Sequence, residues 1–254
     1  MKTIQQIKSM KSKQKIVMLT AYDFPTAKLM DNIVDIILVG DSIGMVVLGY
    51  ENTTKVTMQD MLRATEAVAR GAKNSLIVGD MPIGTYDNKL NALKNAKQFL
   101  KAGANAVKIE KKPEIAEFLV KNKIDVMGHI GLTPQTITNF KVQGKYGKSA
   151  KRLVEEAKAC EKSGCFSLVL ECIPLNLAKK ITQSISIPTI GIGAGIHCDG
   201  QVLVTHDILG LFEAFKPKFV KRYADLSSLM KKAFEQYAKE VRKGEFPSDE
   251  HSFH

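Results

Sequence analysis

The chain has no tryptophan, and aromatic residues make up only 7% of its 254 residues. A surface that stacks single-stranded nucleic acid needs aromatic side chains interleaved with basic ones, and no such pattern occurs here. No apolar run approaches the roughly 20 residues that a membrane-spanning helix requires. The basic N-terminal segment also lacks the apolar stretch of a secretion signal. We therefore expect a cytoplasmic protein with neither a membrane nor a nucleic-acid partner.

The sequence has no CxxC pair, and its four cysteines do not have a zinc-type spacing with histidine. We expect these cysteines to be reduced structural thiols. The net charge of +11 would suit an RNA-binding protein or an enzyme with anionic substrates. Most lysines, however, alternate with glutamates in stretches of helical periodicity, which is typical of solvated helix faces.

Eight short apolar runs alternate with segments that have the spacing of amphipathic helices. Runs of Val, Ile and Leu are typical of parallel strands buried on both faces. They occupy residues 16–20, 36–39, 76–79, 106–109, 124–128, 167–170, 188–192 and 202–204. This number of strands in about 250 residues predicts an α/β fold with a single (β/α)8 TIM barrel.

Two helices are expected outside the barrel repeat, one near the N-terminus and one at residues 226–244, as a C-terminal extension. The predicted single domain spans residues 1–254 and ends in a short polar tail at about 245–254. The tail carries His251 and His254, which we assign to a loosely ordered terminus and not to a metal site. Thr57 has the character of an N-cap for the helix that follows it.

Four of the apolar runs end on a carboxylate, at Asp41, Asp80, Glu110 and Glu171. One such residue has an ordinary explanation, because strands lead into polar loops. Four favour a shared site, because the chemistry of parallel α/β folds lies at the C-terminal ends of the strands. Two carboxylates about 4 Å apart repel by about 1 to 4 kcal/mol unless one is protonated or a cation lies between them. An all-oxygen ligand set favours Mg²⁺, with Mn²⁺ as the alternative.

Three further side chains are candidates near these acids. Lys108 lies on the same strand face as Glu110, where it would bind an anionic substrate or simply pair with Glu110. Glu171 follows a very apolar strand, and burial there would raise the pKa of its carboxyl and favour a general base. For His129, at another strand end, structural and functional roles are both open. The glycine-rich segment 191–195 lacks GxGxxG spacing and is interpreted as the loop after the seventh strand.

Seven segments, in order, resemble the ketopantoate hydroxymethyltransferase family. They are TAYD (20–23), VGDSIGM (39–45), GDMP (79–82), KIE (108–110), GHIGLTPQ (128–135), LECIP (170–174) and IPTIGIGAGIHCDGQVLV (187–204). The resemblance extends from about Met18 to the C-terminal EHSFH. Two features depart from it: Lys111 and Lys112 stand where the family has two glycines, and the segment around 139–149 is shortened.

This resemblance implies transfer of a hydroxymethyl group from 5,10-methylenetetrahydrofolate to 3-methyl-2-oxobutanoate through a magnesium-bound enolate. The product would be 2-dehydropantoate, for pantothenate and coenzyme A biosynthesis. The resemblance further implies a homo-oligomer, a decamer of two pentameric rings. Its cofactor would be Mg²⁺ and its co-substrate the folate.

Residue by residue, the resemblance makes Asp41, Asp80 and Glu110 the Mg²⁺ ligands, with Glu110 acting directly or through water. Asp41, Ser42, Asp80 and Lys108 would bind the oxoacid, and Glu171 would accept the proton, with His129 as an accessory candidate. The main alternative is another Mg²⁺-dependent barrel aldolase or lyase that acts on a 2-oxoacid and that differs in the carbon electrophile or needs no folate. The alternative from another class is a basic RNA-binding protein on a barrel scaffold.

Overall fold

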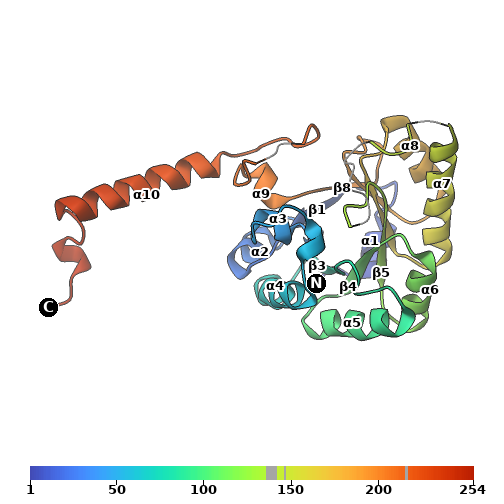
Figure 1. The fold of residues 1–254 in the computed structure, drawn as a ribbon, viewed down its shortest axis with the longest axis horizontal. Coiled ribbons are helices and arrows are strands. Elements are labelled where there is room, and N and C mark those ends of the chain that lie inside the picture. The colour runs from blue at the N-terminus through green and yellow to red at the C-terminus, as the bar shows by residue number, and fades with distance from the viewer. Residues whose placement is uncertain (136–141, 146, 215–216) are drawn as a thin grey trace. The chain divides into compact units, whose positions relative to one another are not determined.

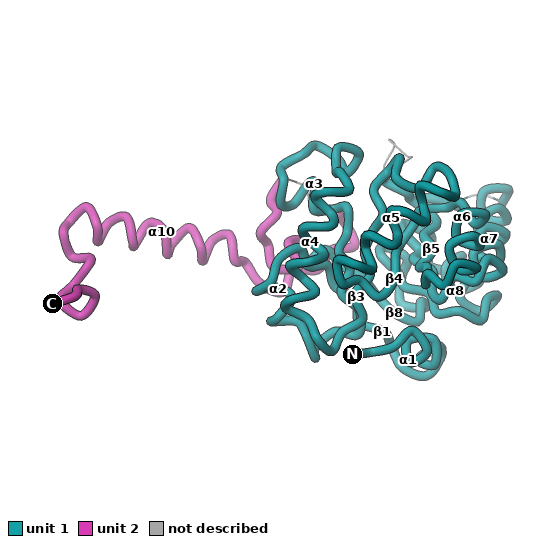
Figure 2. Tube along the Cα trace, turned by 90° about the horizontal axis from the view of Figure 1, so that it is seen from below, with its two compact units in different colours: residues 1–204 teal, residues 205–254 magenta. Residues whose placement is uncertain are grey.

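The computed structural model describes residues 1–135, 142–145, 147–214 and 217–254. The chain forms two compact units, Met1–Val204 and Thr205–His254 (Figure 2). Part of the shortened segment at 139–149 lies outside the described residues. The single domain expected over residues 1–254 stays a prediction, and each unit is described by itself below.

Eight parallel strands close a barrel in sequence order, with β1 paired to β8 (Figure 1). The strands are β1 (Ile16–Thr20), β2 (Ile36–Val39), β3 (Leu76–Asp80), β4 (Ala106–Glu110), β5 (Val126–Gly131), β6 (Ser167–Glu171), β7 (Thr189–Ile192) and β8 (Gly200–Leu203). The predicted (β/α)8 barrel is thus confirmed. Most boundaries agree to within one residue, and the larger differences are in β5, predicted at 124–128, and β8, predicted at 202–204. At Gly200 a Cβ atom would lie 2.6 Å from the Ile16 carbonyl oxygen, so glycine permits this close strand contact.

Helices follow most strands and cover the outside of the barrel. In the first unit they are α1 (Ile4–Ser9), α2 (Phe24–Met30), α3 (Ile43–Val46), α4 (Met58–Gly71), α5 (Lys89–Lys101), α6 (Pro113–Lys121), α7 (Gly147–Lys162) and α8 (Leu175–Ser184), with a 3-10 turn, η1 (Thr53–Lys55). Thr57 caps α4 as predicted, because its side chain accepts from the Asp60 N–H and Asp60 accepts in return.

Alternate strand residues face two separate apolar clusters. Ile37 and Val39 point outward and pack with the helices, whereas Ile36 and Leu38 point into the barrel. The inner cluster also contains Ile7, a fully buried residue of α1. The predicted N-terminal helix therefore closes the end of the barrel at which the strands begin.

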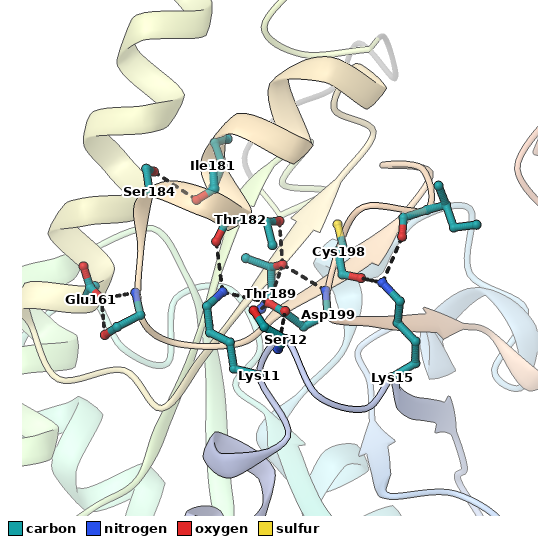
Figure 3. Close-up of polar contacts among 12 residues, drawn as sticks. Lys11, Ser12, Lys15, Glu161, Ile181, Thr182, Ser184, Thr189, Cys198 and Asp199 are labelled. Carbon is teal, nitrogen blue, oxygen red and sulfur yellow. Dashed lines mark hydrogen bonds and ion pairs between the residues drawn. The ribbon is translucent and has the colours of Figure 1, made fainter.

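Polar contacts at this same N-terminal end attach the chain before β1 to the last two strands (Figure 3). The Asp199 carboxylate accepts from Lys11 Nζ at 2.9 Å, from the Ser12 N–H at 3.1 Å and from the Thr189 N–H at 2.9 Å. The Thr189 hydroxyl contacts that of Thr182 at 2.7 Å. Burial alone would raise the pKa of Asp199, but the Thr189 amide and the Lys11 ammonium hold that pKa below its usual value.

The second unit contains α9 (Thr205–Ile208), α10 (Leu226–Lys243) and a 3-10 turn, η2 (Asp249–His251). The predicted C-terminal helix is confirmed, and Gly244 ends it in the left-handed conformation with φ +70°. The tail is less featureless than expected, because the Phe246 ring lies 5.5 Å from that of Tyr237 in α10. Among the described residues, no helix has the length and apolar character needed to cross a bilayer.

Asp199→Asn should lower the free energy of unfolding by about 3 kcal/mol at pH 7, because Lys11 loses its buried anionic partner. The pKa of Asp199 is lower in the folded than in the unfolded chain, so its contribution is complete above about pH 4 and declines as the pH falls further. Urea unfolding of both proteins at pH 7 and at about pH 3 measures the difference. An equal difference at the two pH values would contradict an ionised Asp199.

Candidate active site

Five neighbouring strands place the predicted site residues at the C-terminal mouth of the barrel. Asp80 ends β3 and pairs in register with Lys108 of β4. Glu110 pairs with His129 of β5, and Gly131 pairs with Glu171, the last residue of β6. Adjacent strands lie about 4.8 Å apart, so this register places neighbouring side chains within contact distance.

Lys108 is buried and binds Asp80. Its Nζ lies 2.8 Å from each carboxylate oxygen of Asp80. The sequence also allowed an ion pair of Lys108 with Glu110 alone, and the structure does not have that arrangement. Burial would lower the pKa of Lys108, but Asp80, Asp41 and Glu110 together raise that pKa above its usual value. Lys108 therefore carries a positive charge at neutral pH.

The three carboxylates predicted as metal ligands are buried together around this single ammonium group. Asp41 follows β2, and its backbone N–H donates to Asp80 Oδ2 at 3.3 Å. Burial, followed by the charge of Asp80, raises the pKa of Asp41 to about 8, although Lys108 acts to lower it. With all three acids ionised, two negative charges remain without a compensating cation among these four side chains.

The composition of this cluster fits a hard divalent cation. Its donors are all oxygen atoms, and its excess negative charge would be offset by Mg²⁺. Within the described ranges, no three His, Cys, Asp or Glu side chains already form a metal-ligand group. In this arrangement, Lys108 engages both oxygens of Asp80, and the Gln135 side chain engages Asp41.

His129 lies between two acids of the site. Its Nε2 is 3.1 Å from Glu171 Oε2 and its Nδ1 is 3.5 Å from Glu110 Oε1, although neither nitrogen meets the angular geometry of a regular hydrogen bond. Burial and Lys108 would lower the pKa of His129, but Glu110 and Glu171 raise it to about 9. The imidazole therefore links Glu171, whose side chain is 15% exposed, with the buried Glu110.

Ser42 and Tyr22 lie together near Asp41. The Ser42 hydroxyl is 2.7 Å from the Tyr22 hydroxyl, which belongs to the TAYD segment after β1. This contact holds Ser42 in the turn that leads from β2 into α3.

The sequence reasoning assigned no role to two buried residues of this cluster, Gln135 and Tyr86. Gln135 Nε2 donates to Asp41 Oδ2 at 2.9 Å, and the Tyr86 hydroxyl donates to Gln135 Oε1 at 2.5 Å. Gln135 is the last residue of the segment GHIGLTPQ, and its position in this family-like segment could have indicated that it belongs to the site. No comparable pattern in the sequence indicated Tyr86.

Comparison with known proteins identifies the family. The family model described as "Ketopantoate hydroxymethyltransferase" matches residues 1–249. The chain belongs to the ketopantoate hydroxymethyltransferase family. A relative from Carboxydothermus hydrogenoformans, named 3-methyl-2-oxobutanoate hydroxymethyltransferase, is 54% identical over 99% of this chain and 95% of its own. A relative from Syntrophus aciditrophicus with the same name is 53% identical over 99% of this chain and 96% of its own. The protein is therefore an enzyme, a hydroxymethyltransferase.

Solved structures with low sequence identity agree on the fold. Phosphonopyruvate hydrolase, in a crystal structure with oxalate and Mg²⁺, has a TM-score of 0.66 at 12% identity, over 99% of this chain and 93% of that one. The 2,3-dimethylmalate lyase, described as a member of the PEP mutase/isocitrate lyase superfamily, has a TM-score of 0.61 at 15% identity, over 100% of this chain and 93% of that one.

Two lysines of this hydroxymethyltransferase stand where the family pattern has glycines, and their backbone conformation is unusual. Lys111 and Lys112 both have positive φ angles, +54° and +52°, directly after Glu110. A non-glycine residue in this region costs about 1–2 kcal/mol, which explains why glycines suit the position. The Lys112 ammonium contacts Asp87 Oδ1 at 2.5 Å and lies 5.2 Å from the centre of the Tyr86 ring.

Replacing Lys111 by glycine should raise the free energy of unfolding of this hydroxymethyltransferase by up to about 1 kcal/mol. Glycine removes the left-handed strain, and the greater freedom of the unfolded glycine chain offsets part of that gain. Lys111→Ala is the matched control, because it removes the same side chain but keeps a Cβ atom. Urea unfolding compares the three proteins. A glycine variant less stable than the alanine variant would show that the strain is not significant.

Proposed function

We propose that this enzyme transfers a hydroxymethyl group from 5,10-methylenetetrahydrofolate to 3-methyl-2-oxobutanoate, forming 2-dehydropantoate for pantothenate and coenzyme A biosynthesis. The names of the relatives at 53–54% identity support the oxoacid as acceptor. The observation that carries the proposal is the buried group of Asp41, Asp80 and Glu110 around Lys108, beside Glu171. A cytoplasmic location and a decamer belong to the same proposal and rest on the family resemblance.

Asp41, Asp80 and Glu110 are the residues that would hold Mg²⁺. Their oxygen donors and uncompensated charge support this assignment. The phosphonopyruvate hydrolase structure indicates that a barrel of this fold accommodates Mg²⁺ together with oxalate. When bound, the ion supplies Lewis-acid polarisation of the keto group of the oxoacid.

Lys108 and Ser42 would orient the carboxylate of the oxoacid. The Lys108 ammonium keeps its charge because acidic neighbours surround it, so it would bind the substrate carboxylate once a cation offsets those acids. The Ser42 hydroxyl is held by Tyr22 and supplies a directional hydrogen bond. Together, a charge and a directional contact restrict how the oxoacid lies at the mouth of the barrel.

Glu171 would remove the proton from C3 of the oxoacid. The C3–H bond breaks, its electron pair enters the enolate, and the enolate carbon forms a bond to the methylene carbon of the folate. Over the complete reaction both C–N bonds of that methylene carbon break, water supplies the hydroxyl group, and tetrahydrofolate leaves. Glu171 is suited to this step because it is partly exposed at the barrel mouth and lies 3.1 Å from His129. His129, which contacts Glu110 on its other side, would hold the Glu171 carboxylate in place.

The complete reaction gives the first test. Formation of 2-dehydropantoate, followed by mass spectrometry, should require both 5,10-methylenetetrahydrofolate and Mg²⁺, and omission of either should reduce it to background. The alternative, a 2-oxoacid aldolase or lyase on the same barrel, would instead turn over an oxoacid without folate. Folate-independent carbon–carbon chemistry would therefore replace the proposed reaction with that alternative.

Glu171→Gln separates binding from proton transfer. The wild-type enzyme with Mg²⁺ and 3-methyl-2-oxobutanoate should exchange the C3 hydrogen for deuterium in heavy water without folate, as proton NMR of the methine measures. The glutamine side chain has nearly the same volume but cannot accept the proton, so exchange should fall by about 10²- to 10⁴-fold. Turnover should fall in parallel.

Oxoacid binding by Glu171→Gln, measured by calorimetry, is the control for an intact site. Exchange at the wild-type rate in this variant would assign the base elsewhere, with His129 as the next candidate. Turnover by the wild-type enzyme without any folate-free exchange would mean that proton removal requires bound folate.

A further inference from the structure

Gln135 joins three parts of the barrel mouth that are distant in sequence. Its side chain is buried, and its Nε2 donates to Asp41 Oδ2 at 2.9 Å and to the Met81 carbonyl oxygen at 3.0 Å. Its Oε1 accepts from the Tyr86 hydroxyl, and its backbone N–H donates to Glu110 Oε2 at 3.3 Å. One residue thus contacts two of the three carboxylates assigned to the metal.

The surroundings determine the orientation of the Gln135 amide. The Met81 carbonyl oxygen can only accept, so the NH₂ end of the amide must face it and Asp41. The opposite end then meets the Tyr86 hydroxyl, which donates. A glutamate at this position would face two acceptors, and a methionine would neither donate nor accept in this way. The site therefore requires the amide chemistry of Gln135.

We propose that Gln135 is a positioning residue that orients the Asp41 and Glu110 carboxylates for a divalent cation, and that Tyr86 fixes the Gln135 amide. This inference deepens the proposed function and rests on it. The bond to Oδ2 fixes the plane of the Asp41 carboxylate, while the backbone N–H of Gln135 contacts Glu110. Residues that orient metal ligands in this way typically change metal affinity or activity 10- to 100-fold when they are replaced.

Gln135→Met tests the side-chain part of this role, because methionine has a similar length and keeps the backbone N–H. Mg²⁺ affinity of the full-length enzyme, measured by calorimetry without substrates, should fall about 10- to 100-fold. Gln135→Glu should not restore it at neutral pH. Tyr86→Phe removes a single hydroxyl and should give a smaller loss in the same direction.

A double-mutant cycle with Asp41→Asn distinguishes positioning from general loosening of the barrel. If Gln135 acts through Asp41, Gln135→Met should cause much less loss of Mg²⁺ affinity in the Asp41→Asn background. Thr189→Val is the matched stability control, because it removes the buried hydroxyl contacts to Thr182 and Asp199 at the other end of the barrel. It should lower the thermal midpoint and leave Mg²⁺ affinity unchanged.

The outcomes separate the two levels of inference. A wild-type enzyme that does not bind Mg²⁺ would overturn both the proposed metal site and the role of Gln135. Wild-type affinity in Gln135→Met, or an equal loss in Thr189→Val, would overturn the positioning role alone. If Gln135→Met does not fold, Tyr86→Phe decides: unchanged affinity overturns the inference, and reduced affinity with normal thermal stability supports it.

Discussion

Asp41, Asp80 and Glu110 are buried around one ammonium group, that of Lys108, and the cost of ionising all three acids together is the constraint that the site must satisfy. Burial, followed by repulsion from Asp80, raises the pKa of Asp41 to about 8. The proposed cation would offset this repulsion, and its binding would release a proton from Asp41 at neutral pH. The same acids keep Lys108 charged at neutral pH.

The two ends of the barrel differ in how the charges of their buried carboxylates are compensated. At the N-terminal end, Asp199 has one cation, Lys11, and several hydrogen-bond donors, so its charge is matched within the fold. At the C-terminal end, the four carboxylates of Asp41, Asp80, Glu110 and Glu171 outnumber two basic groups, Lys108 and His129, and the pKa of Asp41 rises to about 8. The closed sheet between them allows one end to provide stability without constraining the other. Thr189→Val is a useful control for this reason.

The fold could be predicted because the order of the strands is evident in the sequence. The carboxylates could be predicted because they stand at the ends of strands. Buried parallel strands show as apolar runs, and each of Asp80, Glu110 and Glu171 ends one of these strands. Which side chains touch was less accessible: Lys108 pairs with Asp80 across the β3–β4 register and not with the nearby Glu110. Gln135 and Tyr86 lie in loops, where neither a hydrophobic periodicity nor the end of a strand indicates that a residue belongs to the site. Their role depends on contacts across sequence separations that no local pattern encodes.

Among the described non-glycine residues with positive φ, three lie directly after two strands that supply site residues. Lys111 and Lys112 follow Glu110, and Cys172 follows Glu171 with φ +49°. A residue in the left-handed conformation turns the chain sharply. The acidic residue before it is therefore the last residue of the strand, and the chain does not leave the strand gradually. The Cys172 N–H still donates to the Ile192 carbonyl at 2.9 Å, which ties this turn to β7 and fixes the backbone of Glu171. The cost of such turns is tolerated because the closed barrel determines the strand positions on both sides, and the carboxylates gain a defined direction at the mouth.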